Sequence, residues 1–380
     1  MERAILIGAP LKRSGAGRQL AEHLSELARL ADTAGAVVVG ELTQRLDRPH
    51  PGTYLGKGKI EALRAQIEAT GATLLIFDDE LTPAQGKNIE EATGLRVIDR
   101  AELILDIFAT RARTSEAKMQ VELAQLEYMR TRLTRMWTHL EKFRGGIGVR
   151  GPGETQLESD RRLIGHRIKL LRERLDDVGK ARAVQRRGRR AEFRVSLVGY
   201  TNAGKSSILR GLSGDADVVV EDRLFATLDP LTRRITVPGP AQVLVTDTVG
   251  FIRKLPHHLV ASFRATLEEL TEADQIVHVV DASEPLWEDQ YAVGEEVLGE
   301  LGAAHTPVLT AFNKMDALDA GERDALQEHA RALYPNSVFI SATEPDGLEP
   351  LRRALGRVVG ARHRNGTGNG TGNGTGALVH

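Results

Sequence analysis

The feature that most constrains the fold is a glycine-rich segment at residues 199–206, with the sequence GYTNAGKS. It follows a short apolar run that contains Val195, Leu197 and Val198, and it precedes a stretch with helical character. The spacing G-x-x-x-x-G-K-S between a strand and a helix is typical of a loop whose backbone N–H groups surround a polyphosphate. We therefore expect a strand, a phosphate-binding loop and a helix here, as in a parallel α/β sheet.

This loop predicts three kinds of contact with a nucleotide. The ammonium group of Lys205 would contact the β- and γ-phosphates, and the hydroxyl group of Ser206 would bind Mg²⁺. The following helix would add the positive end of its dipole. A chance glycine-rich turn is the alternative interpretation. The residues expected around the phosphates are Gly199, Tyr200, Thr201, Asn202, Ala203, Gly204, Lys205, Ser206 and Ser207.

The remaining sequence predicts a mixed α/β fold in five parts. Two stretches alternate short apolar runs with helical patterns, which predicts parallel sheets covered by helices. The expected parts are an N-terminal α/β domain at 1–110, a long antiparallel helical hairpin at 111–180, a basic linker at 181–192, a doubly wound P-loop domain at 193–360 and a disordered low-complexity tail at 361–380.

Local signals locate individual elements. Strands are expected at 4–7, 36–39, 73–77, 96–98, 194–198, 233–237, 243–246, 276–280, 308–312 and 338–340, and helices at 19–30, 59–68, 83–92, 259–270 and 349–359. The third helix has Thr82 as N-cap, Pro83 in the first helical position and Gln85 to complete a capping box. The segment 51–60 lacks the G-x-G-x-x-G order, so we interpret it as a structural turn, with a second nucleotide site as the alternative.

Two amphipathic stretches predict the hairpin, because their apolar residues recur at steps of three and four. They are Met119, Leu123, Leu126, Met129, Leu133, Met136, Leu140 and Phe143 in the first stretch, and Ile164, Ile168, Leu171, Leu175 and Val178 in the second. The segment 144–153, RGGIGVRGPG, interrupts the helical pattern through its glycines and Pro152. Its basic tip is either an inert turn or a probe that enters a negatively charged groove.

A second motif, Asn313-Lys314-Met315-Asp316, follows an expected strand and favours guanine over adenine. The Asp316 carboxylate can accept hydrogen bonds from guanine N1–H and the exocyclic amine, and adenine offers no such donor pair. Asn313 would bridge to the phosphate loop, and the stem of Lys314 would cover the base. A backbone N–H in the segment Ser341-Ala342-Thr343 would reach the guanine oxygen.

Two further segments are expected to face the γ-phosphate. In Asp247-Thr248-Val249-Gly250 the carboxylate would hold Mg²⁺, and the Gly250 N–H would contact the phosphate. In Phe225-Ala226-Thr227 the threonine hydroxyl would be a second ligand of Mg²⁺. The expected metal ligands are Ser206, Thr227 and Asp247, and the expected catalytic residues are Lys205, Gly250 and Thr227. Contacts of this kind order two segments only while the γ-phosphate is present, which is a switch.

The composition of the chain limits where the protein can act. The chain of 380 residues has no cysteine, which excludes disulfides and thiolate metal sites and suits a reducing cytoplasm. No stretch approaches the roughly 20 apolar residues of a membrane span. We expect a monomeric cytoplasmic protein that can associate with the membrane periphery. The expected RNA contacts are Arg144, Gly145, Gly146, Arg150, Gly151 and Gly153 at the tip, and Arg186, Arg187, Arg189 and Arg190 in the linker. The alternative for this basic linker is a solvated surface.

Together these motifs resemble the HflX-type GTPases, in the translation-factor class of P-loop GTPases. The resemblance rests on GGIGVRGPGETQLESDRR at 145–162, TYLGKGK at 53–59, the segment 99–126, LFATLDP and DTVGFIRKLP, and it extends to about residue 360. It implies a bacterial cytoplasmic GTPase that binds GTP or GDP with Mg²⁺ and associates with the large (50S) ribosomal subunit. It also implies contact with ribosomal RNA in the 70S ribosome, which some members split by inserting the hairpin tip.

One position departs from many GTPases. Phe251 stands where they have a glutamine that orients the attacking water, so intrinsic hydrolysis is expected to be slow and stimulated by the ribosome. Roles in ribosome splitting, rescue and biogenesis all remain open. One alternative is a low-turnover, nucleotide-gated RNA-binding scaffold, and another is an ATP-driven RNA remodeller.

Overall fold

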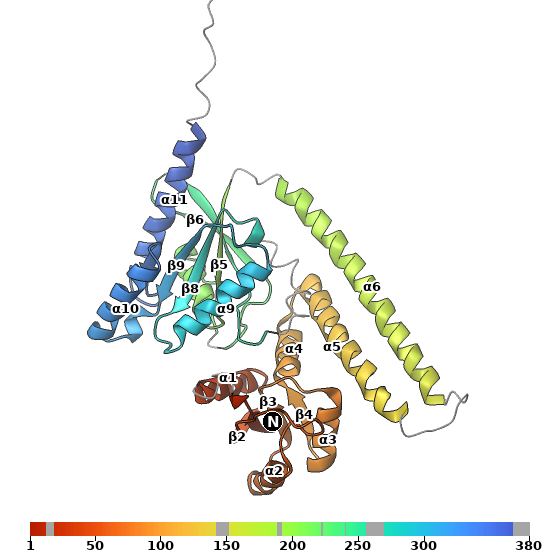
Figure 1. The fold of residues 1–380 in the computed structure, drawn as a ribbon. Helices are drawn as coiled ribbons and strands as arrows, with labels where there is room; N and C mark the ends of the chain where they lie inside the picture. The colour runs from red at the N-terminus through yellow and green to blue at the C-terminus, as the bar shows by residue number, and fades with distance from the viewer. Residues whose placement is uncertain are drawn as a thin grey trace, which may run out of the picture. The chain divides into compact units, whose positions relative to one another are not determined.

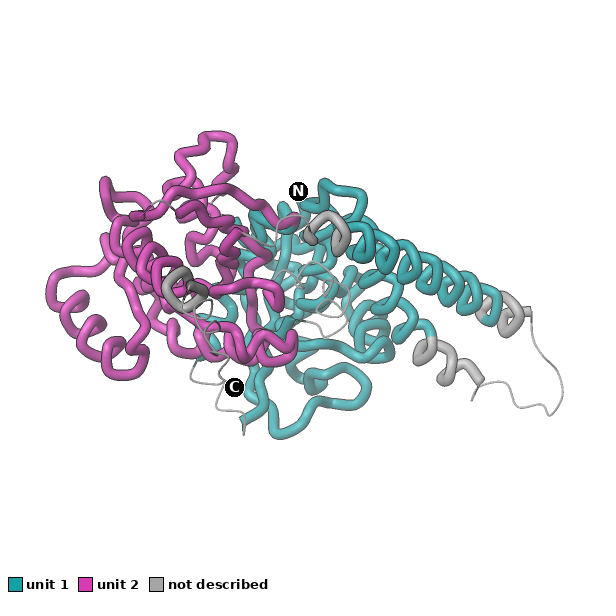
Figure 2. The backbone as a smooth tube through the Cα atoms, turned by 90° about the horizontal axis from the view of Figure 1, so that it is seen from above, with its two compact units in different colours: residues 1–183, 223–228, 254–265 teal, residues 184–222, 229–253, 266–380 magenta. Residues whose placement is uncertain are grey.

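A computed structural model describes residues 1–12, 19–141, 152–187, 192–221, 223–239, 241–255 and 270–367 (Figure 1). The chain forms two compact units (Figure 2). Unit 1 comprises Met1–Ala183, Arg223–Leu228 and Lys254–Ala265. Unit 2 comprises Val184–Asp222, Asp229–Arg253 and Thr266–His380. The predicted helix at 259–270 lies outside the described residues except for its last residue.

Unit 1 contains the predicted parallel sheet, in the strand order β2-β1-β3-β4. The strands are β1 (Arg3–Gly8), β2 (Val37–Thr43), β3 (Leu74–Phe77) and β4 (Arg96–Asp99), and all three pairings are parallel. Helices α1 (Leu20–Thr33), α2 (Lys57–Thr70), α3 (Pro83–Thr93) and α4 (Arg100–Arg111) connect and follow them. Apolar residues of β1 and β3 pack with Leu63 of α2 and Ile89 of α3, so these two helices cover one face of the sheet.

Local signals in unit 1 act as the sequence predicts. Thr82 and Gln85 form the capping box, with the Gln85 backbone N–H donating to Thr82 Oγ1 at 3.3 Å and the Thr82 N–H to Gln85 Oε1 at 3.0 Å. The segment 51–60 contains a turn in which His50 and Tyr54 exchange two backbone hydrogen bonds of 2.9 Å. Tyr54 and Leu55 then enter the core, which supports a structural interpretation of this turn.

The predicted hairpin consists of α5 (Ser115–Glu141) and α6 (Pro152–Arg187), which run in opposite directions (Figure 1). Their seam is apolar and contains Met119, Leu123, Leu126, Ile164, Ile168, Leu171 and Leu175. Arg167 donates two hydrogen bonds to Glu122 across the helices, at 2.6 and 2.9 Å. The hairpin is therefore held by both apolar and charged contacts.

Three details differ from expectation. Met129 is 44% exposed, because α5 turns a second face, with Val121, Ala124 and Tyr128, into the interior of unit 1. Helix α6 begins at Pro152, since proline at a first helical position lacks only an N–H that has no helical partner. The same helix continues to Arg187, so most of the expected linker at 181–192 is helical.

Buried Asp99 at the end of β4 connects the sheet of unit 1 to α4 and α5. Its carboxylate accepts hydrogen bonds from the backbone N–H of Leu81 at 3.1 Å and of Glu102 at 3.0 Å. It also accepts the hydroxyl of Tyr128 at 2.9 Å and forms an ion pair with Arg132. One carboxylate, 1% exposed, thus caps α4 and holds α5.

Unit 2 is a doubly wound sheet in the order β10-β9-β8-β5-β7-β6. The strands are β5 (Phe193–Gly199), β6 (Leu231–Thr236), β7 (Gln242–Asp247), β8 (Gln275–Asp281), β9 (Val308–Asn313) and β10 (Ser337–Phe339). All pairs are parallel except β6 with β7, whose antiparallel pairing follows from the short connection between them.

Helices cover both faces of this sheet. Helices α7 (Lys205–Ser213) and α11 (Glu349–Thr367) pack on one face through Leu209 and Leu355. On the other face, α9 (Trp287–Glu300) and α10 (Ala320–Leu333) pack against Phe312. Helix α11 extends seven residues beyond the expected domain end at 360, into the first Asn-Gly-Thr repeat. None of the helices that the structure describes has the length and apolar composition needed to cross a bilayer.

Candidate functional site

The phosphate loop lies between the carboxyl end of β5 and the first residue of α7. Its conformation requires glycine at both ends. Gly199 has a φ of 144°, and a Cβ there would lie 2.1 Å from the Val279 carbonyl oxygen. Gly204 has a φ of 95°, and a Cβ there would lie 2.3 Å from Asn313 Nδ2. The glycines of the motif thus allow the loop to approach β8 and the Asn-Lys-Met-Asp segment closely.

The side chain of Lys205, the first residue of α7, is buried against this loop. Its ammonium group donates to the carbonyl oxygens of Gly199 at 3.0 Å and Tyr200 at 2.8 Å. Burial lowers the pKa of Lys205 to about 8. Nearby Asp247 partly opposes this shift through its negative charge. A phosphate bound here would supply further negative charge and restore the ordinary pKa.

Two predicted metal ligands are already in contact. The Ser206 hydroxyl donates to Asp247 Oδ2 at 2.6 Å, which places a hydroxyl and a carboxylate oxygen together beside the loop. Mg²⁺ prefers hard oxygen ligands and is usually held by one or two protein groups together with phosphates and water. Within the described ranges, no group of three or more His, Asp or Glu side chains could hold a metal. The Ser206–Asp247 pair therefore fits Mg²⁺ that is bound together with a nucleotide.

Asn313 joins the base-recognition motif to the phosphate loop. Its Nδ2 donates to the Ala203 carbonyl at 2.9 Å, and its Oδ1 accepts from the Ala342 backbone N–H at 3.1 Å. Both bonds are local to unit 2. One buried amide thus fixes three segments, around residues 203, 313 and 342, relative to one another.

Asp316 is held in place by two hydroxyl groups that follow β10. Ser341 Oγ donates to Asp316 Oδ1, and Thr343 Oγ1 donates to Oδ2 at 3.2 Å. The hydrogen bond from Ser341 lowers the pKa of Asp316, so the carboxylate is charged at neutral pH. Ser341 and Thr343 thus orient the acceptor that guanine requires.

The sequence analysis missed Asp281, which pairs with Lys314 Nζ at 2.6 Å through its Oδ2. Its position was the available signal, because Asp281 ends the apolar run of β8 as Asp247 ends that of β7. Lys314 has a φ of 64°, and its backbone starts the short helix η2 (Met315–Ala317) that presents Asp316.

The expected γ-phosphate segments lie in different units. Gly250 of unit 2 packs directly on the loop, since a Cβ there would lie 2.7 Å from Thr201 Cα and 3.0 Å from Lys205 Nζ. Phe225, Ala226 and Thr227 belong to unit 1, where the ring of Phe225 meets that of Phe108 edge-on at 4.6 Å. The structure therefore brings Ser206, Asp247 and Gly250 together within unit 2, and places Thr227 in unit 1.

Lys254, which the sequence analysis also missed, belongs to a charged network within unit 1. Its ammonium group contacts Asp78 Oδ2 at 2.8 Å and Asp79 Oδ1 at 2.6 Å. Buried Arg100 pairs with the same Asp78 at 3.0 Å and with Glu26. The network has no local sequence signal, because its members are far apart in the chain.

The expected RNA contacts are not placed. Arg144, Gly145, Gly146, Arg150, Gly151, Arg189 and Arg190 lie outside the described residues. Gly153, Arg186 and Arg187 lie within α6. The contacts of all these residues with RNA remain a prediction.

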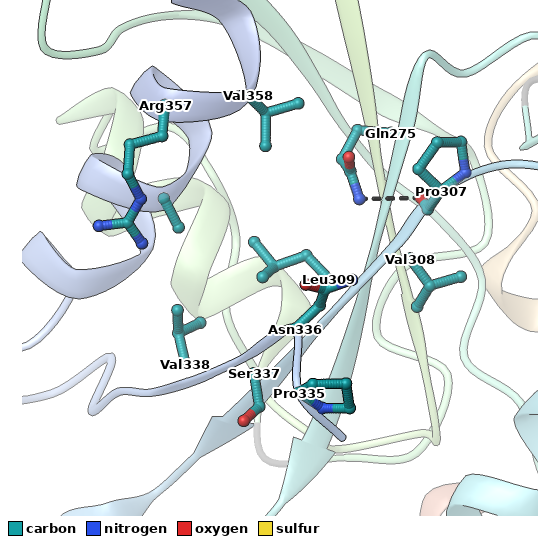
Figure 3. Close-up of a pocket in the computed structure, with 11 residues that line it drawn as sticks. Gln275, Pro307, Val308, Leu309, Pro335, Asn336, Ser337, Val338, Arg357 and Val358 are labelled. Carbon is teal, nitrogen blue, oxygen red and sulfur yellow. Dashed lines mark hydrogen bonds between the residues drawn. The ribbon is translucent and has the colours of Figure 1, made fainter. Parts of the chain in front are cut away.

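A cavity of about 260 Å³ lies at the other end of the unit 2 sheet (Figure 3). Residues at the amino ends of β8, β9 and β10 line it together with Ala354, Arg357 and Val358 of α11. Gln275 Nε2 donates to the Pro307 carbonyl at 2.8 Å beside it (Figure 3). Since open α/β sheets bind ligands at the carboxyl ends of their strands, this cavity is separate from the nucleotide site.

Comparison with known proteins points to the same class of nucleotide site. The chain is 49% identical over 358 residues to GTPase HflX of Lacrimispora saccharolytica, a match that covers 93% of this chain and 82% of the relative. The chain belongs to the HflX family of GTPases. GTPase HflX of Escherichia coli is a second relative, 46% identical over 336 residues, with 88% of this chain and 78% of the relative covered.

Three family models match successive parts of the chain. The matched descriptions are "GTP-binding GTPase N-terminal" at residues 21–109, "GTP-binding GTPase Middle Region" at 111–189 and "50S ribosome-binding GTPase" at 194–314. The crystal structure of SsGBP with GDP has a TM-score of 0.51 and 25% identity, and the match covers 95% of this chain and 99% of that chain. As a member of the HflX family, the chain is a GTP hydrolase with a P-loop domain.

Proposed function

We propose that the chain binds GTP with Mg²⁺ in unit 2, hydrolyses it, and uses the bound state to act on the large ribosomal subunit. Its expected task is to split or rescue stalled or idle 70S ribosomes in the cytoplasm, as a monomer. The observation that carries the nucleotide part is the hydrogen bond from Asn313 to the Ala203 carbonyl, which joins base recognition to phosphate binding. The family description "50S ribosome-binding GTPase" at residues 194–314 supports the ribosomal part.

Each group has a role in this proposal. Asp316 selects guanine, Lys205 neutralises the phosphates, and the Gly250 N–H contacts the γ-phosphate. Ser206 and Asp247 would hold Mg²⁺, with Thr227 as a further ligand. The metal would supply a positive charge that offsets the negative charge developing on the phosphate oxygens.

The side chain of Phe251 explains why GTP hydrolysis would need a catalytic group from outside the chain. Its ring is 1% exposed and has no polar atom, so it cannot orient an attacking water. A catalytic group supplied from outside can raise such rates by about 10³–10⁵-fold. We assign that part to the ribosome, with the hairpin tip and the basic end of α6 as the RNA-binding segments.

GTP turnover with and without large ribosomal subunits tests this assignment. We expect subunits to accelerate turnover by at least about a hundredfold, within reach of what supplied catalytic groups achieve. Replacing residues 145–153 with a short linker should leave GTP affinity unchanged and remove subunit splitting.

Equal turnover with and without subunits would contradict the assignment, and so would splitting by the protein without its tip. The matched control exchanges Arg161 and Arg162 of α6 for lysine, which keeps both the tip and the charge. Competition by ATP on equal terms with GTP would instead favour the RNA remodeller.

The pKa of Lys205 predicts how nucleotide binding depends on pH. The free protein has a pKa of about 8 at this site, whereas the phosphate-bound lysine should return towards 10.5. Between these values binding takes up a proton, so affinity should fall with rising pH by up to about tenfold per unit. Below pH 8 the dependence on this group should vanish.

Calorimetry at pH 9 in buffers of different ionisation enthalpy measures the proton directly. We expect uptake of nearly one proton by the wild-type protein. Lys205→Arg serves as the control, because its guanidinium group stays charged throughout. Proton release by the wild-type protein, or equal uptake by the variant, would contradict the prediction.

A further inference from the structure

The segment that follows the Asp-Thr-Val-Gly motif is attached to the phosphate loop by backbone hydrogen bonds. The Thr201 N–H donates to the Phe251 carbonyl at 2.7 Å, and the Phe251 N–H donates to the Gly199 carbonyl at 3.0 Å. Together they form a short parallel bridge between Tyr200 and Phe251, beyond the end of the β5–β7 ladder. The bridge lies wholly within unit 2.

A side chain extends this bridge by two residues. The backbone N–H of Arg253 donates to the hydroxyl of Tyr200 at 2.8 Å. Tyr200 is 7% exposed, so water competes little for this bond. A phenol in the phosphate loop therefore holds the chain on the far side of Phe251, a contact that phenylalanine could not make.

The ring of Phe251 is fixed by its packing against α9. A Cβ on Gly294 of α9 would lie 3.6 Å from Phe251 Cδ2 and 2.5 Å from His278 Cε1, so both rings pack closely against that glycine. Phe251 and Ile252 are each 1% exposed. The bridge and this packing together place residues 250–253 in one well-defined position.

That position brings Gly250 close to the phosphate loop. A Cβ on Gly250 would lie 2.7 Å from Thr201 Cα and 3.0 Å from Lys205 Nζ, so the backbone at residue 250 packs closely on both residues. In the proposed role of Gly250, a γ-phosphate would be accommodated between Lys205 and the Gly250 N–H. Accommodating this phosphate would move residues 250–253, whereas GDP lacks the phosphate.

We infer that Tyr200 is a positioning residue whose hydroxyl group holds residues 250–253 closed over the phosphate loop, so that the chain discriminates against GTP relative to GDP until this latch opens. The inference rests on the proposed role of the Gly250 N–H at the γ-phosphate. A ligand shifts a conformational equilibrium only by its difference in affinity for the two states. Weakening a contact made only in the closed state therefore raises the affinity for GTP and leaves that for GDP unchanged.

Tyr200→Phe tests the latch, because it removes the hydroxyl and keeps the ring. The loss of one buried hydrogen bond corresponds to about a three- to tenfold change in an equilibrium. We expect a non-hydrolysable GTP analogue to bind about three to ten times more tightly, and GDP to bind within about twofold of wild type. Amide hydrogen exchange at residues 250–253 of the nucleotide-free protein should become faster. Tyr334→Phe, which removes a tyrosine hydroxyl elsewhere in unit 2, should change neither quantity.

The outcomes separate the latch from the site itself. If the wild-type protein fails to bind either nucleotide, the proposed function fails. If it binds both, and Tyr200→Phe leaves the ratio of the two affinities unchanged or lowers it, the latch is wrong. Equal losses for the analogue and GDP would show that the hydroxyl only shapes the loop, which also overturns the inference. Unchanged hydrogen exchange at residues 250–253 would do the same.

Discussion

Replacing Asp316 with asparagine is expected to lower the affinity for GTP by roughly 10²–10⁴-fold, because two hydrogen bonds to a charged acceptor are lost. The carboxylate accepts from guanine N1–H and the exocyclic amine, and an asparagine amide nitrogen would face that amine as a second donor. Ser341 and Thr343 hold the side chain at this position. The asparagine therefore cannot turn away from the base to reduce the loss of affinity.

The same substitution should create a site for xanthine. Xanthine has a carbonyl where guanine has its amine, so the amide introduced by Asp316→Asn can accept from N1–H and donate to that oxygen. Fluorescence titration with GTP and xanthosine triphosphate measures the exchange of specificity. Asp324→Asn, an exposed change of charge on α10, is the matched control. Wild-type affinity for GTP in the Asp316→Asn variant would mean that this carboxylate does not read the base.

Replacing Asp99 with alanine is expected to destabilise unit 1 by about 3–5 kcal/mol, the usual result of removing one partner of a buried ion pair. Arg132 would lose its counter-ion, and the Tyr128 hydroxyl and two backbone N–H groups would lose their acceptor. Such a loss is a large part of the roughly 5–15 kcal/mol that stabilises a typical protein.

Chemical denaturation, followed by a probe on α5, measures the effect. Asp106→Ala is the matched control, because Asp106 lies on α4, the helix that Asp99 caps, is half exposed and contacts Arg96 only at 3.8 Å. It should cost less than about 1 kcal/mol. Equal destabilisation by the two substitutions would show that Asp99 is not the junction between the sheet and α5.

Much of the fold is readable in the sequence because its signals are local. The capping box at Thr82 and the phosphate loop at 199–206 each lie within a few residues, and the apolar runs of both sheets fall where the strands are. Helix α4 was not predicted, since seven of its twelve residues are buried and its polar face is narrow, with Glu102, Asp106 and Thr110. The antiparallel direction of β6 was not predicted either, because apolar runs carry no direction.

The site was predictable to the extent that motifs define it. Asn313 and Asp316 were found because their spacing repeats a known solution to guanine recognition. The residues that hold these two side chains in place were harder to predict from the sequence. Asp281 lies 33 positions before Lys314, and Tyr200 lies 53 positions before Arg253, so no short-range pattern connects them. Only the folded arrangement shows that these side chains meet.

The chain order of the two units has a practical consequence. Two short segments from the second half of the sequence, Arg223–Leu228 and Lys254–Ala265, are built into unit 1, where Phe225 meets Phe108 and Lys254 meets Asp78. No single cut therefore separates the halves. In a truncated protein that starts at residue 192, Phe225 would lose its contact with Phe108 and Lys254 would lose its ion pair with Asp78. Both residues lie a few positions from the catalytic motifs in the sequence. Enzymology on such a fragment would describe a different molecule from the intact chain.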